Sequence, residues 1–174
     1  IFIELDYIKC VIKNRTFDNQ KDGYTTGKIV SAFESNLILL GNKFIKNNYE
    51  SILIKPGSRS TEPFQLIENH FVDCTTGRLL VNSEDGGFST NPIIKGNTFE
   101  RIDISSELFV FSFNYYPCTL LFESNTFKSV TTKFGGFGGK ITLTSTESNI
   151  APELTFESCL FIENKQTTQG GAFC

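Results

Sequence analysis

The sequence predicts an all-β fold, a parallel β-solenoid of about six coils, and three observations predict it. Similar short segments recur along the 174 residues at nearly constant spacing. Apolar and polar residues alternate inside each segment, and no segment has an extended helical pattern of apolar residues. The chain is rich in Phe, with 18 residues, and in turn-forming Asn, Gly, Ser and Thr, which favours strands joined by frequent turns.

A phenylalanine closes each repeated segment and marks the repeat. The segments are VIKNRTF, LLGNKF, LIENHF, IIKGNTF, LFESNTF and TFESCLF. Their final residues are Phe17, Phe44, Phe71, Phe99, Phe127 and Phe161. The steps between these anchors are 27, 27, 28, 28 and 34 residues. Steps this similar predict one structural unit that is repeated from one end of the chain to the other.

Each unit contains an amphipathic strand before its anchor. The residues seven and five places before the anchor are mostly apolar, from Cys10 and Ile12 in the first unit to Leu154 and Phe156 in the last. Apolar residues at every second position, which all lie on one face, indicate a strand. A second apolar run follows the anchor, as in GKIVSAF, SILIK, GRLLV, ELFVFSF, GGKITL and GGAF.

A unit of this length cannot bury its apolar face alone, but it can do so when copies stack at a strand spacing of ~4.8 Å. Equivalent residues then lie above one another. The anchor phenylalanines are therefore predicted to form an internal aromatic stack, each contributing roughly 1.5–3 kcal/mol by burial.

A polar ladder is predicted two places before the anchor. The residues there are Asn42, Asn69, Asn97 and Asn125 in four consecutive units. Stacked amides can hydrogen-bond to the coils above and below, whereas an unpaired buried amide would cost about 1–3 kcal/mol. Arg15 and Cys159 occupy the same position in the first and last units, and they are predicted to end the ladder.

The repeat spans residues 1–174 as a single domain. Length variation falls in predicted loops at residues 18–27, 55–63, 82–92 and 144–152. Six coils would form a rod of roughly 29 Å at ~4.8 Å per coil. The strand-like IFIEL at one end and GGAFC at the other lead us to expect a section of a longer β-helix, or ends that meet other chains.

Charge and cysteine content narrow the function classes. The sixteen Lys and Arg residues and the nineteen Asp and Glu residues are scattered along the chain. This distribution argues against a basic patch that binds nucleic acid. No apolar stretch approaches the ~20 residues of a membrane helix, so direct membrane insertion is not expected. The five cysteines form no CxxC pair. Two interpretations of them stay open, namely buried thiols and one or two disulfides. The sequon Asn14-Arg15-Thr16 makes Asn14 a candidate glycosylation site and favours the secretory route.

The last unit carries a family resemblance. FIEN followed by GGAF, at residues 161–164 and 170–173, resembles the paired FxxN and GGA[ILV] repeats of chlamydial polymorphic outer-membrane proteins and of similar protist surface proteins. FIKN at residues 44–47 matches the first half again. The resemblance implies a right-handed parallel β-helix of the pectin-lyase-like type. It also implies a role in surface display or adhesion. Together with the strand-like ends, this leads us to expect other chains or further coils as partners at both ends, and glycans as a further candidate.

A glycan-cleaving β-helix is the alternative, and it would need clustered acid and base groups. His70, Asp73 and Arg101 lie near anchors of successive units and would form such a cluster if they met. Glu123 and Glu157 occupy equivalent positions in neighbouring units and could share a proton or a calcium ion. A surface histidine beside a surface ion pair, and two solvated glutamates, are the simpler interpretations. We therefore predict no catalytic, cofactor or metal residues and a non-catalytic surface or filament protein; an intracellular scaffold is a third hypothesis.

Overall fold

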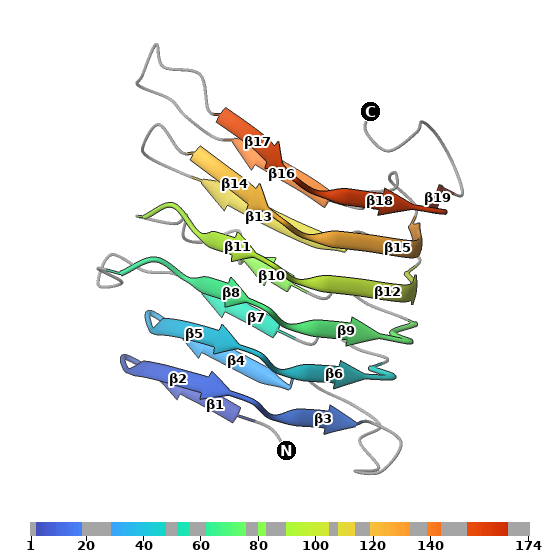
Figure 1. Ribbon diagram of the computed structural model, residues 1–174. Helices are drawn as coiled ribbons and strands as arrows, with labels where there is room; N and C mark the ends of the chain where they lie inside the picture. The colour runs from blue at the N-terminus through green and yellow to red at the C-terminus, as the bar shows by residue number, and fades with distance from the viewer. Residues whose placement is uncertain are drawn as a thin grey trace.

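The computed structural model describes residues 3–18, 29–47, 52–55, 62–75, 80–82, 90–104, 108–113, 119–132, 139–143 and 153–166. This part of the chain is all-β, with no helix, and its strands form three parallel sheets (Figure 1). Sheet A contains β1 (Ile3–Asp6), β4 (Val30–Phe33), β7 (Ile52–Lys55), β10 (Leu80–Asn82), β13 (Phe109–Phe113) and β16 (Gly139–Leu143). Sheet B contains β2 (Lys9–Lys13), β5 (Asn36–Leu40), β8 (Gln65–Ile67), β11 (Ile93–Lys95), β14 (Thr119–Glu123) and β17 (Glu153–Glu157). Sheet C contains β3 (Thr16–Asp18), β6 (Lys43–Ile45), β9 (His70–Val72), β12 (Thr98–Asp103), β15 (Thr126–Thr132) and β18 (Leu160–Ile162), and β19 (Lys165–Gln166) pairs with β15.

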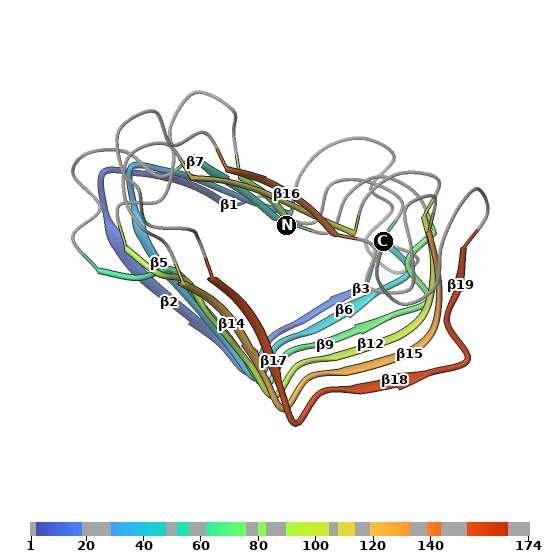
Figure 2. The ribbon, with the colours of Figure 1, turned by 90° about the horizontal axis from the view of Figure 1, so that it is seen from above.

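Each strand of a sheet pairs with the strand three places later in the chain order. The chain therefore enters the sheets in turn, and three successive strands, such as β1 to β3, form one layer. Figure 1 shows the layers stacked in sequence order along one direction. Seen from above in Figure 2, sheets B and C meet at a corner, and sheet A lies across the interior from that corner.

The strand register places the recurring phenylalanines one above the other. Phe17 pairs with Phe44, and the series continues through Phe71, Phe99 and Phe127 to Phe161. The 34-residue step between Phe127 and Phe161 keeps this register. The second apolar runs become strands of sheet A, except GGAF, which lies outside the described residues.

The core lies between the three sheets. Alternate residues of sheet B point inward and are fully buried, including Leu39, Leu66 and Phe122. Phe109 of sheet A packs edge-on against Phe99 of sheet C, with ring centroids 5.2 Å apart, and against Phe122 at 5.6 Å. One aromatic side chain thus joins all three sheets, which is how a short repeat acquires a continuous core.

Left-handed residues turn the chain at two long columns, and also at Tyr7 and Glu34, which lie between sheets A and B in the first two layers. At the corner between sheets B and C, φ lies between 53° and 66° in every layer. The residues there are Asn14, Gly41, Glu68, Gly96, Ser124 and Ser158. From Asn14 to Ser124, each of their N–H groups donates to a carbonyl of the next layer, for example Gly41 to Ile67 at 3.0 Å. A second column, inside or at the end of the sheet C strands, contains Lys46, Asp73, Arg101, Ser129 and Glu163. Non-glycine residues in this region cost of order 1–3 kcal/mol each and persist because the stacked layers hold them there.

Candidate functional site

The asparagine ladder occupies the corner next to the first left-handed column and is buried. Asn97 shows its geometry: Nδ2 donates to the carbonyl of Leu66 in the preceding layer at 2.7 Å and to Oδ1 of Asn125 in the following layer at 2.9 Å. Its Oδ1 accepts from the backbone N–H of Asn69 at 2.9 Å and from Asn69 Nδ2 at 3.2 Å. All four hydrogen-bonding capacities of this buried amide are used. Asn42 and Asn69 repeat the pattern, with Asn42 Nδ2 donating to Ile12 and Asn69 Nδ2 to Leu39.

The ladder ends where the sequence predicts. At one end, the backbone N–H of Arg15 donates to Asn42 Oδ1 at 3.0 Å, so the arginine side chain takes no part in this bond. At the other end, the Cys159 thiol donates to the carbonyl of Phe122 at 3.1 Å, the bond that an asparagine amide makes in every preceding rung. Asn125 Nδ2 reaches the Cys159 sulfur only at 3.9 Å. A thiol replaces the donor half of the amide but is a weak acceptor.

The anchor phenylalanines form a continuous face-to-face stack beside the ladder. Successive ring centroids are 5.0, 4.6, 5.1, 5.0 and 4.9 Å apart, and interplanar angles do not exceed 17°. Phe44, Phe71, Phe99 and Phe127 are almost completely buried. The stack and the ladder account for the invariant part of the repeat as structural positions.

The asparagine of the FxxN motif has a related role that the sequence analysis did not assign. Asn164 Oδ1 accepts from the backbone N–H of Val130 at 2.9 Å, and Nδ2 donates to the carbonyl of Phe127 at 3.1 Å. Asn164 therefore links its layer to the preceding layer, next to the second left-handed column. Asn47 holds the equivalent position and is buried, but among the described residues its Nδ2 has no hydrogen-bond partner. The motif itself was the signal that could have identified this contact.

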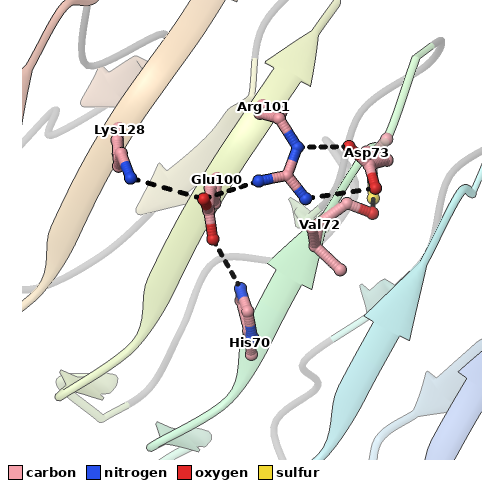
Figure 3. A network of polar contacts seen from close by, with 7 residues as sticks. His70, Val72, Asp73, Glu100, Arg101 and Lys128 are labelled. Atoms are coloured by element: carbon pink, nitrogen blue, oxygen red, sulfur yellow. Dashed lines mark hydrogen bonds and ion pairs between the residues drawn. The ribbon is translucent and has the colours of Figure 1, made fainter.

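A charged cluster lies on the outer face of sheet C (Figure 3). Arg101 donates to both carboxylate oxygens of Asp73, from Nε at 2.6 Å and from Nη2 at 3.3 Å, and its Nη1 donates to Glu100 at 2.6 Å. The second left-handed column places Asp73 and Arg101 in adjacent layers, so the fold brings this predicted ion pair together.

Glu100 is the centre of the cluster, and the sequence analysis did not single it out. One of its oxygens lies 3.5 Å from Lys128 Nζ, and the other lies 3.4 Å from His70 Nε2. His70 is thus placed beside Glu100, while Asp73 is paired with Arg101. The strand register, which pairs Glu100 with Val72 and Lys128, is what sets these neighbours.

The electrostatics of the cluster keep its carboxylates ionised. The hydrogen bond from Arg101 lowers the pKa of Asp73 and raises the pKa of Arg101. Partial burial raises the pKa of Glu100, but the charges of Arg101 and Lys128 and the close approach of Lys128 and His70 outweigh this effect, and the net direction is down. Arg101 is 53% exposed and Asp73 is 34% exposed, so water screens the pair strongly. A general acid would need a pKa shifted the other way.

The two glutamates of sheet B are neighbours, as their equivalent positions predict. The register pairs Glu123 with Glu157. Lys95 Nζ of the preceding layer lies 2.6 Å from Glu123 Oε1, and this hydrogen bond raises the pKa of Lys95. In the described part of the chain, no group of three or more His, Cys, Asp or Glu residues could hold a metal ion.

Burial makes two of the described thiols, Cys10 and Cys74, harder to ionise. Cys10, Cys74 and Cys159 are free, while Cys118 and Cys174 lie outside the described residues. Burial raises the pKa of Cys74 to about 12 and also raises the pKa of Cys10. Such thiols stay protonated at neutral pH and behave as small apolar groups. Asn14, the candidate glycosylation site, is exposed at the first left-handed column.

Comparison with protein-family models, with curated proteins and with solved structures finds no match to this chain. Within the described ranges, no helix has the length and apolar character needed to span a membrane.

Proposed function

We propose that this chain is a section of a right-handed parallel β-helix that serves as a non-catalytic structural or adhesion protein at the cell surface or outside the cell. The coiling is supported by the pairing of every strand with the strand three places later in three parallel sheets. Right-handedness follows the rule that ~98% of parallel crossover connections within one sheet have that hand.

The observation that carries the structural role is the column of stacked phenylalanines, which runs through all six layers beside the amide ladder. These repeated residues serve the contact between layers. The outer cluster on sheet C consists of ion pairs with carboxyl pKa values held low, which does not favour proton transfer to a substrate. The exposed sequon at Asn14 supports a secreted location.

The last layer supports assembly through the end of the stack. Leu154 is 45% exposed, whereas Leu120, its register partner in the preceding layer, is 2% exposed. Phe161 is likewise less buried than Phe127. Further coils, or another chain, would cover these inward-facing side chains and pair with the edges of β17 and β18.

Electron microscopy of purified protein tests this function. We expect rods, or filaments that lengthen end to end, with a repeat near the ~4.8 Å strand spacing. Globular monomers without end contacts at every concentration would contradict the proposal.

A glycan panel tests the absence of catalysis. Wild-type protein and the Glu100→Gln variant should both leave the glycans uncleaved. Cleavage by the wild type that is lost in Glu100→Gln would identify a carbohydrate-active enzyme instead and would place its site at the cluster on sheet C.

A further inference from the structure

A small hollow lies on the outer face of sheet B, over two interior layers of the stack. It has a volume of about 210 Å³ and lies on β11 and β14, each of which pairs with a strand on both sides (Figure 1). Its floor contains Ile93, which is 39% exposed, and Leu121, its register partner in the following layer. The floor of the hollow is therefore apolar although it faces solvent, and paired strands on both sides hold it in place.

Polar groups close the hollow at both ends along the strands. At one end, Asn91 Oδ1 accepts from the backbone N–H of Thr119 at 3.0 Å. At the other end, Lys95 Nζ lies 2.6 Å from Glu123 Oε1. Asn91 and Lys95 are four residues apart in the chain, which corresponds to roughly 13 Å along a strand.

Polar side chains also interrupt the apolar column across the layers. The register continues from Ile93 to Gln65 in the preceding layer, and from Leu121 to Thr155 in the following layer. Three layer spacings separate Gln65 from Thr155, or about 14 Å in total. The apolar floor is thus two residues wide and has polar side chains on all four sides.

We propose that this hollow binds one neutral sugar ring of a glycan. The proposal names the partner of the adhesion role proposed above and rests on that role. A pyranose ring has a face of C–H groups and carries hydroxyl groups around its perimeter. The C–H face would lie on Ile93 and Leu121. The hydroxyl groups would bond to Asn91, Lys95 and Glu123, in the way that a few polar groups fix the orientation of a ligand over an apolar lining.

The size and outline of the hollow favour a sugar ring over an acyl chain. Its volume lies below the roughly 300 Å³ of the smallest pockets for drug-sized ligands, which suits a single ring. An acyl chain is longer and would extend over Gln65 or Thr155. Covering such a polar side chain with an apolar chain is unfavourable, because its hydrogen bonds to water are lost.

The charges at the rim favour a neutral sugar over an acidic one. Lys95 is already paired with Glu123, and Glu157 is the register partner of Glu123 in the following layer. One lysine and two glutamates carry a net charge of −1. A uronic acid would bring its carboxylate toward this excess of negative charge, which repels it.

NMR spectroscopy of the 174-residue chain with ¹³C-labelled methyl groups tests the proposal. The probes are the methyl glycosides of glucose, galactose, mannose and N-acetylglucosamine, and galacturonate is the acidic comparison. We expect at least one neutral probe to shift the methyl signals of Ile93 and Leu121. The dissociation constant should be on the order of millimolar, because one ring makes few contacts. Galacturonate should bind at least about three-fold more weakly.

Two variants in one column of sheet B test whether the site lies at the hollow. Ile93→Glu places a charge on the apolar floor and should weaken binding about ten-fold or more. Val11→Glu is the matched control, because Val11 is 50% exposed in the same column but lies in the first layer, outside the hollow. This variant should leave binding unchanged. Circular dichroism would verify that both variants are folded.

The wild-type titration can overturn the proposal without any variant. It does so if no neutral probe shifts the signals of Ile93 and Leu121 at concentrations on the order of 100 mM, or if the shifts map to another surface. Binding of galacturonate as tight as that of the neutral probes, or equal weakening by Val11→Glu, would also overturn it. Rods seen by electron microscopy without sugar binding would remove this site and leave the proposed structural function. Sugar binding by a chain that forms no rods would do the reverse.

Discussion

The buried asparagine ladder and the exposed cluster on sheet C are both polar connections between layers, yet they differ in every physical respect. The ladder uses neutral amides, and Asn97 in its interior is 0% exposed with all its hydrogen bonds made. The cluster uses full charges, but Arg101 is 53% exposed. Water competes for the charged groups and cannot reach the amides. From this difference we expect burial and completeness of pairing, and not formal charge, to decide which polar contacts hold the layers together.

The largest expected effect comes from removing one rung of the ladder. Asn97→Ala leaves the carbonyl of Leu66 and the N–H of Asn69 buried without their partners. We expect the free energy of unfolding to fall by about 3 kcal/mol, because each orphaned group costs about 1–3 kcal/mol. Urea denaturation followed by circular dichroism measures this change.

Asn91→Ala provides the matched control. Asn91 is exposed and its Oδ1 accepts from the N–H of Thr119 at 3.0 Å, so solvent can replace the lost bond. We expect a loss below about 1 kcal/mol. Equal losses for the two variants would show that burial does not distinguish the ladder.

A smaller effect of opposite sign is expected at the end of the ladder. Cys159→Asn supplies the acceptor that the thiol lacks, opposite Asn125, and keeps a donor for the carbonyl of Phe122. We expect the free energy of unfolding to rise by about 1 kcal/mol, the usual net value of one added hydrogen bond. Cys159→Ser should not give this gain, because its shorter hydroxyl group cannot form both contacts. A lower urea midpoint for Cys159→Asn would mean that the ladder cannot extend into the last layer.

The repeated part of the molecule could be predicted from the sequence because each layer shows the same pattern of residues. Phe and Asn recur at fixed offsets, so their alignment could be inferred without knowing where the loops run, and the register agrees even across the 34-residue step. The second left-handed column could not be predicted, since Lys46, Asp73 and Arg101 carry no glycine signal. Glu100 was missed for a related reason. Its contacts depend on which long side chains of the neighbouring layers extend toward it, and the repeat does not specify this.

The charged cluster should contribute less to stability than either ladder position. Arg101→Gln removes the bidentate bond to Asp73 and the bond to Glu100. Because these groups are solvated, we expect a change in the urea midpoint far smaller than that of Asn97→Ala. The change should shrink further at high salt, which screens exposed charges but does not affect buried amides. A loss as large as that of Asn97→Ala would reverse the comparison between the two regions.

The smallest expected effect is the pH dependence that Arg101 confers. The pKa of Asp73 is lowered from its ordinary value of 3.8, chiefly by the hydrogen bond from Arg101. The stabilisation from this carboxylate is therefore present above the pKa of the unfolded chain and is lost as pH falls through the lower pKa of the folded state. Carbon-detected NMR titration should find the carboxyl of Asp73 titrating below 3.8 in the wild type and nearer to that value in Arg101→Gln. Asparagine amides do not titrate, so a folded Asn97→Ala variant should show the same Asp73 titration as the wild type. An identical Asp73 titration in the wild type and in Arg101→Gln would mean that Arg101 does not lower the pKa of Asp73.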